Sequence, residues 1–581
     1  MSETNKKTGH PKGLWYLFGT EMWERFGYYL MLGIFALYMI DGWSTGGMGF
    51  SGSKKSDIYG TYLGLVYLTP FIGGLLADRI LGYRRSIVIG GLMMSAGYFC
   101  LSIHTEMSFF IALALIILGN GFFKPNISTL VGNMYSTEER KHLKDSGYNI
   151  FYMGINIGAF VCNFVAAYMR INYGWGHAFA AAGVGMLVGV VIFLLGTKHI
   201  KEYDVVKPVQ KGDMSTLKIL GLTVLPMFIF GIIGYFLKGV TSPTNENGNF
   251  LGSDTNDAFI IGCLPVIGFF IYLAFTAEAK ESRAIKALLA VFTCVILFFA
   301  IFHQNGDALT VWAEDYTSRE MSESVASGAD KIGMAQTVVN NEIVSGDTGL
   351  FNSAVRGLEA KESAITGQDA ESLISKKNIA GQIDELKKSR KYFENLDKDK
   401  IPAQGSNLKL YSTELYQSIN PFWVVLLTPI VVGVFGFLRR RNREPSTPTK
   451  IAIGLVITAL SALVMVGAVM ATNSLSMKAS SWWLIASYGV ITVGELCLSP
   501  MGLSLVSKLS PPRITALMMG GFFLAISVGN KLSGMLSSLW EETAEKQNFF
   551  YLNFALVSVA AIVLFLMLKW LNGVMKENNV K

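Results

Sequence analysis

Charged residues are scarce in this chain of 581 residues. Asp, Glu, Lys and Arg make up 16% of it, hydrophobic residues make up 51%, and the mean hydropathy is +0.40. A typical soluble domain is about 25% charged, so the composition excludes an ordinary soluble protein and indicates a polytopic membrane protein. The net charge of +7 is spread over many loops, which does not indicate a nucleic-acid partner. The lipid bilayer is the first partner that the sequence predicts.

Cysteine is scarce as well. The five cysteines all lie in apolar stretches, and none has the spacing of a metal ligand. We expect buried free thiols rather than disulfides or a zinc site, and no cofactor. No grouping of a nucleophile, a base and an oxyanion hole is present either, so an enzyme is the least favoured class. The first apolar run is too long for a signal peptide and lacks a small-residue cleavage site, so we expect it to be a membrane span.

Fourteen apolar stretches have the ~20-residue length of a membrane-spanning helix. They fall into a group of six, a pair after a polar linker, and a second group of six. This division predicts an all-α membrane protein with an N-terminal six-helix bundle (1–200), a linker with an inserted two-helix hairpin (201–282) and a C-terminal six-helix bundle (283–581). The expected spans lie near residues 14–40, 58–80, 86–104, 108–134, 147–170, 176–196, 215–238, 257–277, 285–318, 420–438, 449–471, 481–508, 513–537 and 548–574.

The basic residues predict the orientation of the chain in the membrane. They crowd the loops that follow even-numbered spans, for example Arg84 after the second span, Lys198 after the sixth and Arg439–Arg441 after the tenth. The opposite loops are poor in Lys and Arg, and the loop 239–256 has neither. Loops rich in Lys and Arg stay on the cytoplasmic side. We therefore expect a cell (inner) membrane protein with both termini in the cytoplasm.

The segment 317–418 differs from the rest of the chain because it is polar. The orientation places it outside the membrane on the extracytoplasmic side. Its apolar residues recur at a loosely helical spacing, and the stretch 370–396 is typical of a helix. We expect a small helical cap without a catalytic motif. Two interpretations stay open, a solvated spacer and a surface for a partner.

The first span carries charged residues at bilayer depth. Glu21, Glu24, Arg25 and Tyr28 are spaced i, i+3, i+4 and i+7, so on a helix they share one face. A charge at the bilayer centre costs at least ~2.5 kcal/mol, so this face must contact protein or an aqueous cavity. Two carboxylates beside a guanidinium predict a proton site. The alternative is that a glutamate only neutralises Arg25 as a structural pair.

Polar residues also lie deep in other predicted spans. Lys124 is about ten residues from either end of the fourth span, which is too deep for easy snorkelling. The twelfth span contains Glu495, a little over one turn before Pro500. Asn156 belongs to a polar stripe of the fifth span. These side chains are suited to the wall of a central cavity.

The loop 74–85 is similar to the Gly-x-x-x-Asp-Arg-x-x-Gly-x-[Lys/Arg] loop of the major facilitator superfamily. Asp78 can pair with Arg79 or Arg84 across neighbouring helix ends. Such a latch would hold the cytoplasmic side shut. The alternative is that these arginines only set the orientation of the chain.

Four motifs together resemble the bacterial type of the proton-coupled oligopeptide transporter family. They are Glu-x-x-Glu-Arg-Phe-x-Tyr-Tyr in the first span, Phe-x-Lys-Pro-Asn in the fourth, Phe-Tyr-x-x-Ile-Asn-x-Gly in the fifth and Gly-Glu-x-x-x-Ser-Pro in the twelfth. The resemblance runs through nearly every span and leaves out mainly the segment 317–418. It implies the fold of the major facilitator superfamily and proton-coupled import of di- and tripeptides by alternating access.

The resemblance also implies roles for individual residues. Glu21 and Glu24 would respond to protons, with Arg25 and Lys124 as their partners. Lys124 would also attract the carboxylate of a peptide, and Glu495 would hold its ammonium group. The other substrate-binding positions that the resemblance implies are Tyr28, Tyr29, Tyr67, Asn156, Asn420 and Phe522.

Two positions depart from the family pattern. Leu32 stands where peptide-transporting members usually have Arg, and His303 stands where an acidic residue is usual. Those family residues form an outer-gate ion pair, and the loss of both leaves neither charge buried alone. His303 could titrate near neutral pH and serve as a proton site, with Asp307 one turn on as its partner. The alternative is a neutral histidine that is hydrogen-bonded in the cavity wall.

Two alternative functions remain. A proton-coupled carrier of another small solute is the nearest one, since relatives that lack the Arg can carry nitrate or other anions. Glu495 argues against an anion, because a carboxylate in the cavity would repel it. The other is a peptide sensor that uses the segment 317–418, although a sensor need not retain the Glu-x-x-Glu-Arg motif with Lys124.

Overall fold

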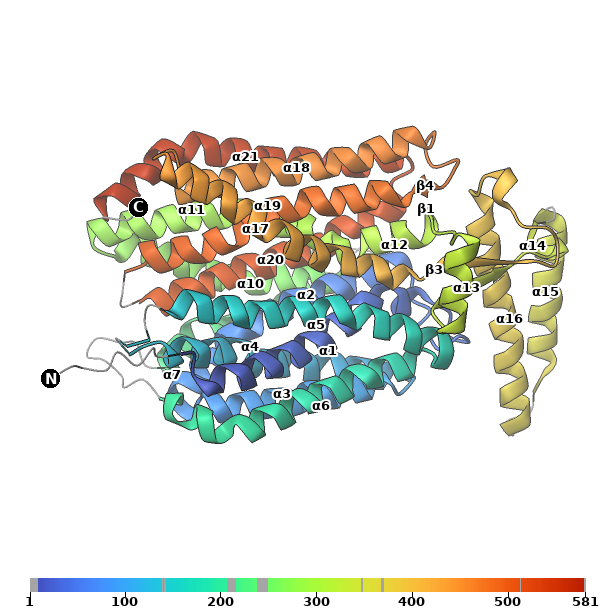
Figure 1. The fold of residues 1–581 in the computed structure, drawn as a ribbon, viewed down its shortest axis with the longest axis horizontal. Coiled ribbons are helices and arrows are strands. Elements are labelled where there is room, and N and C mark those ends of the chain that lie inside the picture. Colours follow the sequence, from blue (N-terminus) through green and yellow to red (C-terminus); the bar gives the residue numbers. More distant parts are fainter. Residues whose placement is uncertain are drawn as a thin grey trace.

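The long helices lie side by side along one axis, and a smaller unit projects from one end of them (Figure 1). The structure is a computed structural model, and it describes residues 9–137, 139–140, 143–205, 216–237, 249–345, 348–366, 370–511 and 514–578. The smaller unit is the segment 317–418, which we call the insert. Both chain termini lie at the opposite end of the helices. We therefore speak of the insert end and the termini end.

The first bundle packs around one apolar core. Helix α1 contacts α5 and α6, while α3 contacts α4 and α6. Long helices form here because lipid offers no hydrogen bonds to the backbone, so each segment must satisfy its own N–H and C=O groups. The helices are α1 (Lys12–Ile40), α2 (Gly52–Leu76), α3 (Tyr83–Leu101), α4 (Glu106–Met134), α5 (Lys144–Tyr173) and α6 (Trp175–Ile200), with the π-helical turn η1 (Ala77–Leu81) after α2 and the 3₁₀ turn η3 (Lys201–Tyr203) after α6.

The second bundle has its own apolar core, and its first span is broken. Helix α11 ends at Phe302, a 3₁₀ turn follows, and the chain continues as α12 to Asp315. The elements of this bundle are α11 (Ala279–Phe302), η4 (His303–Gly306), α12 (Ala308–Asp315), α17 (Ile419–Arg440), α18 (Thr447–Ala471), α19 (Ser481–Leu509), α20 (Thr515–Glu542) and α21 (Lys546–Glu577). The domain boundaries near residues 200 and 283 stay predictions, because helix packing does not test independent folding.

Eleven helices in the described part of the chain are long and apolar enough to cross a membrane. Three further segments complete the fourteen expected spans. Helix α1 carries four charged side chains, α3 begins beside two arginines, and the segment Leu220–Phe236 is shorter than the others. The all-α membrane fold is confirmed. Each expected span falls on helical structure, but 215–238 is divided into α7 and α8, and 285–318 is divided into α11 and α12.

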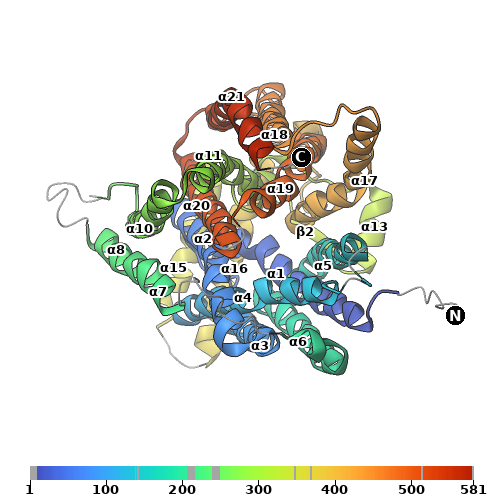
Figure 2. The ribbon, with the colours of Figure 1, turned by 90° about the vertical axis from the view of Figure 1, so that its left-hand side faces the viewer.

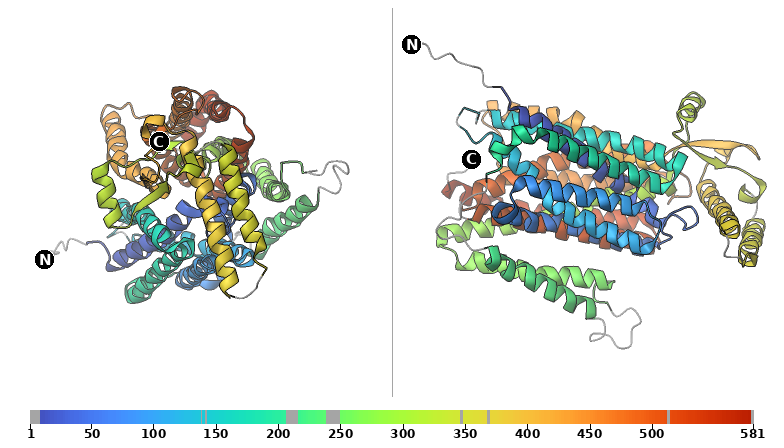
Figure 3. Two further views of the ribbon diagram at one scale, coloured as in Figure 1. Left: turned by 90° about the vertical axis from the view of Figure 1, so that its right-hand side faces the viewer. Right: turned by 90° about the horizontal axis from the view of Figure 1, so that it is seen from below.

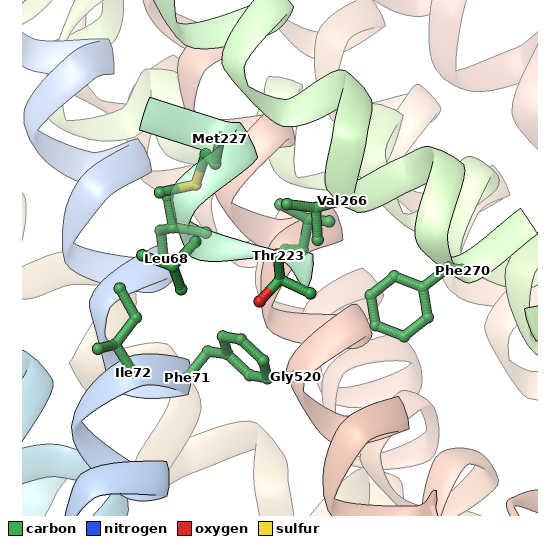
Figure 4. A pocket seen from close by; sticks show the side chains of 10 residues that line it. Leu68, Phe71, Ile72, Thr223, Met227, Val266, Phe270 and Gly520 are labelled. Carbon is green, nitrogen blue, oxygen red and sulfur yellow. The ribbon is translucent and has the colours of Figure 1, made fainter. Parts of the chain in front are cut away.

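The inserted hairpin packs at the seam between the bundles. It consists of α7 (Thr216–Leu222), α8 (Val224–Phe236) and α10 (Asp254–Thr276), and it lies beside α2 and α20 (Figure 2). A narrow crevice separates it from these two helices (Figure 4). The crevice has no charged side chain, so it offers nothing to the charged ends of a polar solute. Its lining residues are Leu68, Phe71, Ile72, Thr223, Val224, Met227, Val266, Phe270, Gly520 and Leu524.

The insert mixes helices with a short β-ribbon, which corrects the expectation of a purely helical cap. Strands β2 and β3 pair antiparallel, with Thr337 opposite Lys409. The expected helix at 370–396 is present as α16. The elements are β1 (Thr317–Ser318), α13 (Glu323–Lys331), β2 (Ala335–Val339), α14 (Glu342–Ser345), α15 (Thr348–Ala364), α16 (Ala370–Glu394), η5 (Lys398–Lys400), β3 (Asn407–Tyr411) and η6 (Thr413–Ser418), and β1 pairs in parallel with β4 (Ala479–Ser480) outside the insert.

Ion pairs join the two bundles at the insert end. Lys55 on α2 pairs with Asp307 before α12, and both side chains are buried. Lys531 on α20 reaches Asp57 on α2 at 2.6 Å. Paired charges of this kind tolerate burial because each carries its own counter-ion. The insert end is closed in this state.

Two more cross-bundle contacts support this closure. Arg170 on α5 donates to Glu414 in η6, with Nη2 2.9 Å from Oε2. Ser527 on α20 donates to the backbone oxygen of Gly64 on α2 at 2.6 Å. The helix backbones approach closely enough for such a bond only where small residues line the seam.

A glycine pair sets the spacing of α2 and α20. A Cβ atom at Gly60 would lie 2.8 Å from the Cα atom of Gly534. We therefore expect Gly60→Val to lower the free energy of unfolding by ~1–3 kcal/mol through overpacking, as measured by thermal unfolding in detergent. Gly436→Val on α17 is the matched control, because a Cβ atom there meets nothing within 4 Å. Equal unfolding temperatures for the two variants would contradict this account of the seam.

Candidate transport site

The charged face of α1 forms one buried cluster. Glu21, Glu24 and Arg25 are exposed by only 3%, 0% and 3%. Arg25 donates to both carboxylate oxygens of Glu24, from Nε to Oε2 and from Nη2 to Oε1 at 2.6 Å. Glu21 is a looser partner: Oε1 lies 3.5 Å from Nε of Arg25, and Oε2 is buried without a hydrogen-bond partner among the described residues. Glu24 and Arg25 thus form a closed pair, while Glu21 keeps one oxygen available for a proton.

Two tyrosines of the same helix lie beside Arg25. The guanidinium carbon is 4.8 Å from the centre of the Tyr28 ring and 5.9 Å from that of Tyr29. The negative face of an aromatic ring stabilises a cation at such distances. The structure therefore brings both predicted substrate-binding tyrosines to the cluster of α1.

Lys124 on α4 faces an aromatic ring instead of a carboxylate. Its Nζ lies 4.2 Å from the centre of the Tyr67 ring on α2. Among the described residues, the carboxylates of Glu21 and Glu24 pair with Arg25 and neither pairs with Lys124. The expected pairing of Lys124 with a glutamate of α1 is absent in this state. Its ammonium group is available to a ligand.

His303 lies where α11 gives way to the 3₁₀ turn η4. Its ring stacks on Phe299 at 5.6 Å between centres and meets the edge of Tyr67 at 5.8 Å. The Nδ1 atom is buried without a hydrogen-bond partner among the described residues. The expected partnership with Asp307 is wrong, because Asp307 pairs with Lys55 across the seam. Tyr67 therefore contacts Lys124 of the first bundle and His303 of the second.

The second bundle contributes a carboxylate of its own. Asn420 on α17 donates to Glu495 on α19 at 3.2 Å and to the hydroxyl of Thr492 at 2.9 Å. These bonds hold the Glu495 side chain while leaving its charge without a cation. The site thus has an available cation on the first bundle and an anion on the second.

Other predicted residues are placed elsewhere. Asn156 donates to the backbone oxygen of Tyr152 in its own helix and is half-buried. Phe522 is 1% exposed and packs against Phe292 and Gly502 in the core of the second bundle. In the described part of the chain, no hydrogen bond or ion pair joins either residue to the charged cluster.

The latch expected at the termini end is described only in part. The side chains of Asp78 and Arg79 lie outside the described residues. Arg84 is the second residue of α3, and the backbone N–H of Tyr83, the first, donates to Asp204 at 2.9 Å. This contact caps α3 and leaves the latch a prediction.

The sequence patterns did not predict the ion pairs of the insert end. Lys531 lies inside the apolar span Leu517–Trp540, so the depth argument applied to Lys124 could have singled it out. Lys55 and Asp57 stand near the start of α2, where charge is ordinary, and only the fold shows their partners.

The arrangement of charges defines a class of protein. In the part of the chain that the structure describes, a polar cluster lies between two helical bundles that are joined at one end, with Lys124 as the available cation on the first bundle and Glu495 as the anion on the second. This geometry serves a solute that passes between the bundles rather than a reaction. The chain is a membrane transporter with the fold of the major facilitator superfamily, not an enzyme.

Sequence comparison places the chain within that superfamily. Residues 84–335 and 407–552 match the sequence profile PTR2, described as the POT family. The chain belongs to the POT family. This match confirms the resemblance to the proton-coupled oligopeptide transporter family.

Individual relatives agree along nearly the whole length. A di-/tripeptide transporter of Lactococcus lactis subsp. lactis (strain IL1403) is 30% identical over 568 residues, which cover 97% of this chain and 96% of the relative. The peptide transporter YePEPT of Yersinia enterocolitica is 28% identical over 571 residues, covering 96% and 92%. A crystal structure of the peptide transporter POT with sulfate superposes with a TM-score of 0.72 at 27% identity, covering 98% and 96% of the two chains.

Substitutions of Glu24, which forms the closed pair with Arg25, and of Glu21, the looser partner, should lower the stability of the protein by different amounts. Glu24→Gln leaves the buried Arg25 with only the loose contact to Glu21, and we expect it to cost ~3–5 kcal/mol of unfolding free energy. Glu21→Gln keeps the bidentate pair and is expected to cost less than half as much. Thermal and denaturant unfolding in detergent would measure both. Equal decreases in the free energy of unfolding of the two variants would contradict the conclusion that Glu24 is the main partner of Arg25.

Proposed function

We propose that the chain is a proton-coupled symporter that imports di- and tripeptides by alternating access. The observation that carries this proposal is the pair of opposite charges on different bundles, Lys124 and Glu495, neither of which has an ion-pair partner among the described residues. A short peptide has a carboxylate at one end and an ammonium at the other. When it bridges these two residues, it draws the bundles together around itself.

The charges of the site favour a zwitterion together with a proton. With Glu24 and Arg25 closed on each other, the remaining ionised groups are Glu21, Lys124 and Glu495, with a net charge of −1. A zwitterion adds no net charge, and one proton on Glu21 makes the loaded site neutral. A neutral site costs less to enclose in a low-dielectric interior than a charged one. The proton is the coupling ion in this proposal, and no other cofactor is needed.

Closure and opening then alternate between the two ends. The ion pairs Lys55–Asp307 and Asp57–Lys531 hold the insert end shut. A latch of Asp78 with Arg79 or Arg84 would close the termini end after these pairs separate. Each proton that moves inward supplies ~2.3 kcal/mol per 100 mV, which is enough to accumulate a peptide tens-fold.

The basic loops support an orientation with both termini in the cytoplasm of an inner-membrane protein. The insert end is then the outer end, where substrate and proton enter. Substrates reach the site from outside only after the ion pairs of this end have opened.

The replacement of the family's Arg and acidic residue by Leu32 and His303 favours one second candidate. Lys124 is left as the cation for a substrate carboxylate, and the unpartnered Nδ1 of His303 can accept or donate one hydrogen bond. A proton-coupled carrier of another small zwitterion would fit the same charges. Glu495 still disfavours a simple anion. A peptide sensor that uses the insert would not need Glu21 to exchange a proton.

Uptake into liposomes distinguishes these candidates. Purified protein is expected to accumulate a labelled dipeptide when a proton gradient is directed inward. Lys124→Ala should lower uptake at least tenfold at low peptide concentration, because it removes the carboxylate's partner. Glu21→Gln should abolish gradient-driven accumulation yet keep exchange of peptide for peptide.

Glu444→Gln in the loop between α17 and α18 is the matched control and should behave as wild type, since among the described residues Glu444 pairs with Arg439 and Lys450 at the edge of the second bundle. Folded wild-type protein that takes up no dipeptide would refute peptide symport. Other small zwitterions would then be tested in the same liposomes.

A further inference from the structure

The insert is fixed to the second bundle by more than its two chain connections. Lys391 on α16 pairs with Asp315, the last residue of α12, at 2.8 Å. Lys478, in the loop before α19, donates to the backbone oxygen of Asp315 at 2.5 Å and covers the ring of Tyr392 at 4.3 Å. Burial and the charge of Arg319 lower the pKa of Lys478 to about 8. Helix α16 therefore rests firmly on the second bundle.

A buried arginine holds the base of the insert in place. Arg319 is 1% exposed and donates to Gln336 and to the backbone oxygen of Tyr411, each at 2.9 Å. Its backbone N–H donates to the Tyr392 hydroxyl at 3.1 Å. Strand β1 also pairs with β4 next to α19. The ribbon and α16 thus move together with the second bundle.

The same unit also contacts the first bundle. Lys388 on α16 pairs with Asp41, which follows the end of α1. Asp41 is 7% exposed, and the Trp175 indole N–H donates to its second carboxylate oxygen at 2.7 Å. Asn172 of α5 donates to the backbone oxygen of Gly333 in the insert at 2.7 Å. Seen from the insert end, α15 and α16 cross in front of the first bundle (Figure 3).

Helix α16 therefore spans the line along which the bundles part. Lys388 and Lys391 are one turn apart and share a face of the helix, yet one contacts the first bundle and the other the second. Any separation of the outer ends must break either the Lys388 contact or the Lys391 contact. Lys391 belongs to the more extensive attachment, so the Lys388 contact is the one that breaks.

We propose that the insert is an outer strap of the transporter, which moves with the second bundle and holds the insert end closed through Lys388–Asp41 and Gly333–Asn172, beside the Arg170–Glu414 pair at its base. The strap rests on the proposed alternating access. It adds to the buried pairs Lys55–Asp307 and Asp57–Lys531 a contact that lies outside the membrane. Lys388 is about half exposed, so water screens the pair and it releases easily. The strap shifts the balance between closed and open states without locking it.

A cross-link tests whether the contact must open. Asp41→Cys with Lys388→Cys is joined by a short bifunctional thiol reagent, because the lysine side chain separates the backbones by more than a disulfide spans. Cys100→Ala is included because Cys100 is partly exposed and could react with the reagent, whereas the other four native cysteines are buried. We expect the cross-linked protein to lose at least nine-tenths of its dipeptide uptake and to regain it when a cleavable reagent is cut. Full uptake by the cross-linked protein would overturn the proposal.

The matched control stays within the insert. Glu359 on α15 and Lys387 on α16 form a half-exposed pair at 3.5 Å, so Glu359→Cys with Lys387→Cys takes the same reagent without crossing to the first bundle. This cross-link should leave uptake unchanged. Equal losses for both cross-links would mean that any stiffening of the insert stops transport, and the strap would be rejected.

A second measurement does not depend on peptide transport. Spin labels at Ser53, at the start of α2, and at Ala544, between α20 and α21, report the distance between the outer ends of the two bundles. We expect Lys388→Glu, which repels Asp41, to increase the open population several-fold, and Lys387→Glu to leave it unchanged. An unchanged distribution in Lys388→Glu would overturn the strap. A shifted distribution in a protein that takes up no peptide would keep the strap and refute the proposed substrate.

Discussion

The cost of placing a charge in a low-dielectric interior governs the whole molecule. Every deeply buried cation described here has found a carboxylate or an aromatic face: Arg25 has Glu24, Lys55 has Asp307, Lys531 has Asp57 and Lys124 has the ring of Tyr67. A removed partner leaves a stranded charge, so the three of these contacts that join different helices fix which helices lie together. The same cost draws attention to the groups without an ion-pair partner among the described residues. A substrate can pair with Lys124 and Glu495, and a proton can bind Glu21.

The fold was predictable because bilayer thickness and backbone hydrogen bonding leave few solutions for long apolar runs. The importance of Glu21, Arg25 and Lys124 was predictable for a related reason, since a charged side chain in such a run must face protein or an aqueous cavity. The partner of Asp307 was not, because Lys55 lies 252 positions away and at the end of a span. The burial of Phe522 also depended on packing against Gly502 and Phe292, which no pattern within one helix encodes.

The two kinds of closure at the insert end differ in strength for a physical reason. The pairs between α2 and the second bundle are largely buried, whereas the Lys388 contact of the insert joins a half-exposed lysine to a buried aspartate. Buried pairs give a sharply defined closed position, and an exposed pair adds a small bias that ionic strength can tune. A transporter that must open at every cycle benefits from combining both, because a closure made only of dry pairs would open slowly.

The charged face of α1 also has a consequence for how the protein is made. This helix precedes α4, α5 and α6 in the chain, yet among the described residues it is absent from the eleven spans that are apolar enough by themselves to cross a membrane. Its carboxylates and guanidinium become tolerable only after α4, α5 and α6 have enclosed them. Helix α1 is thus synthesised before the helices that make its charges tolerable, so its stable place in the membrane depends on α4, α5 and α6.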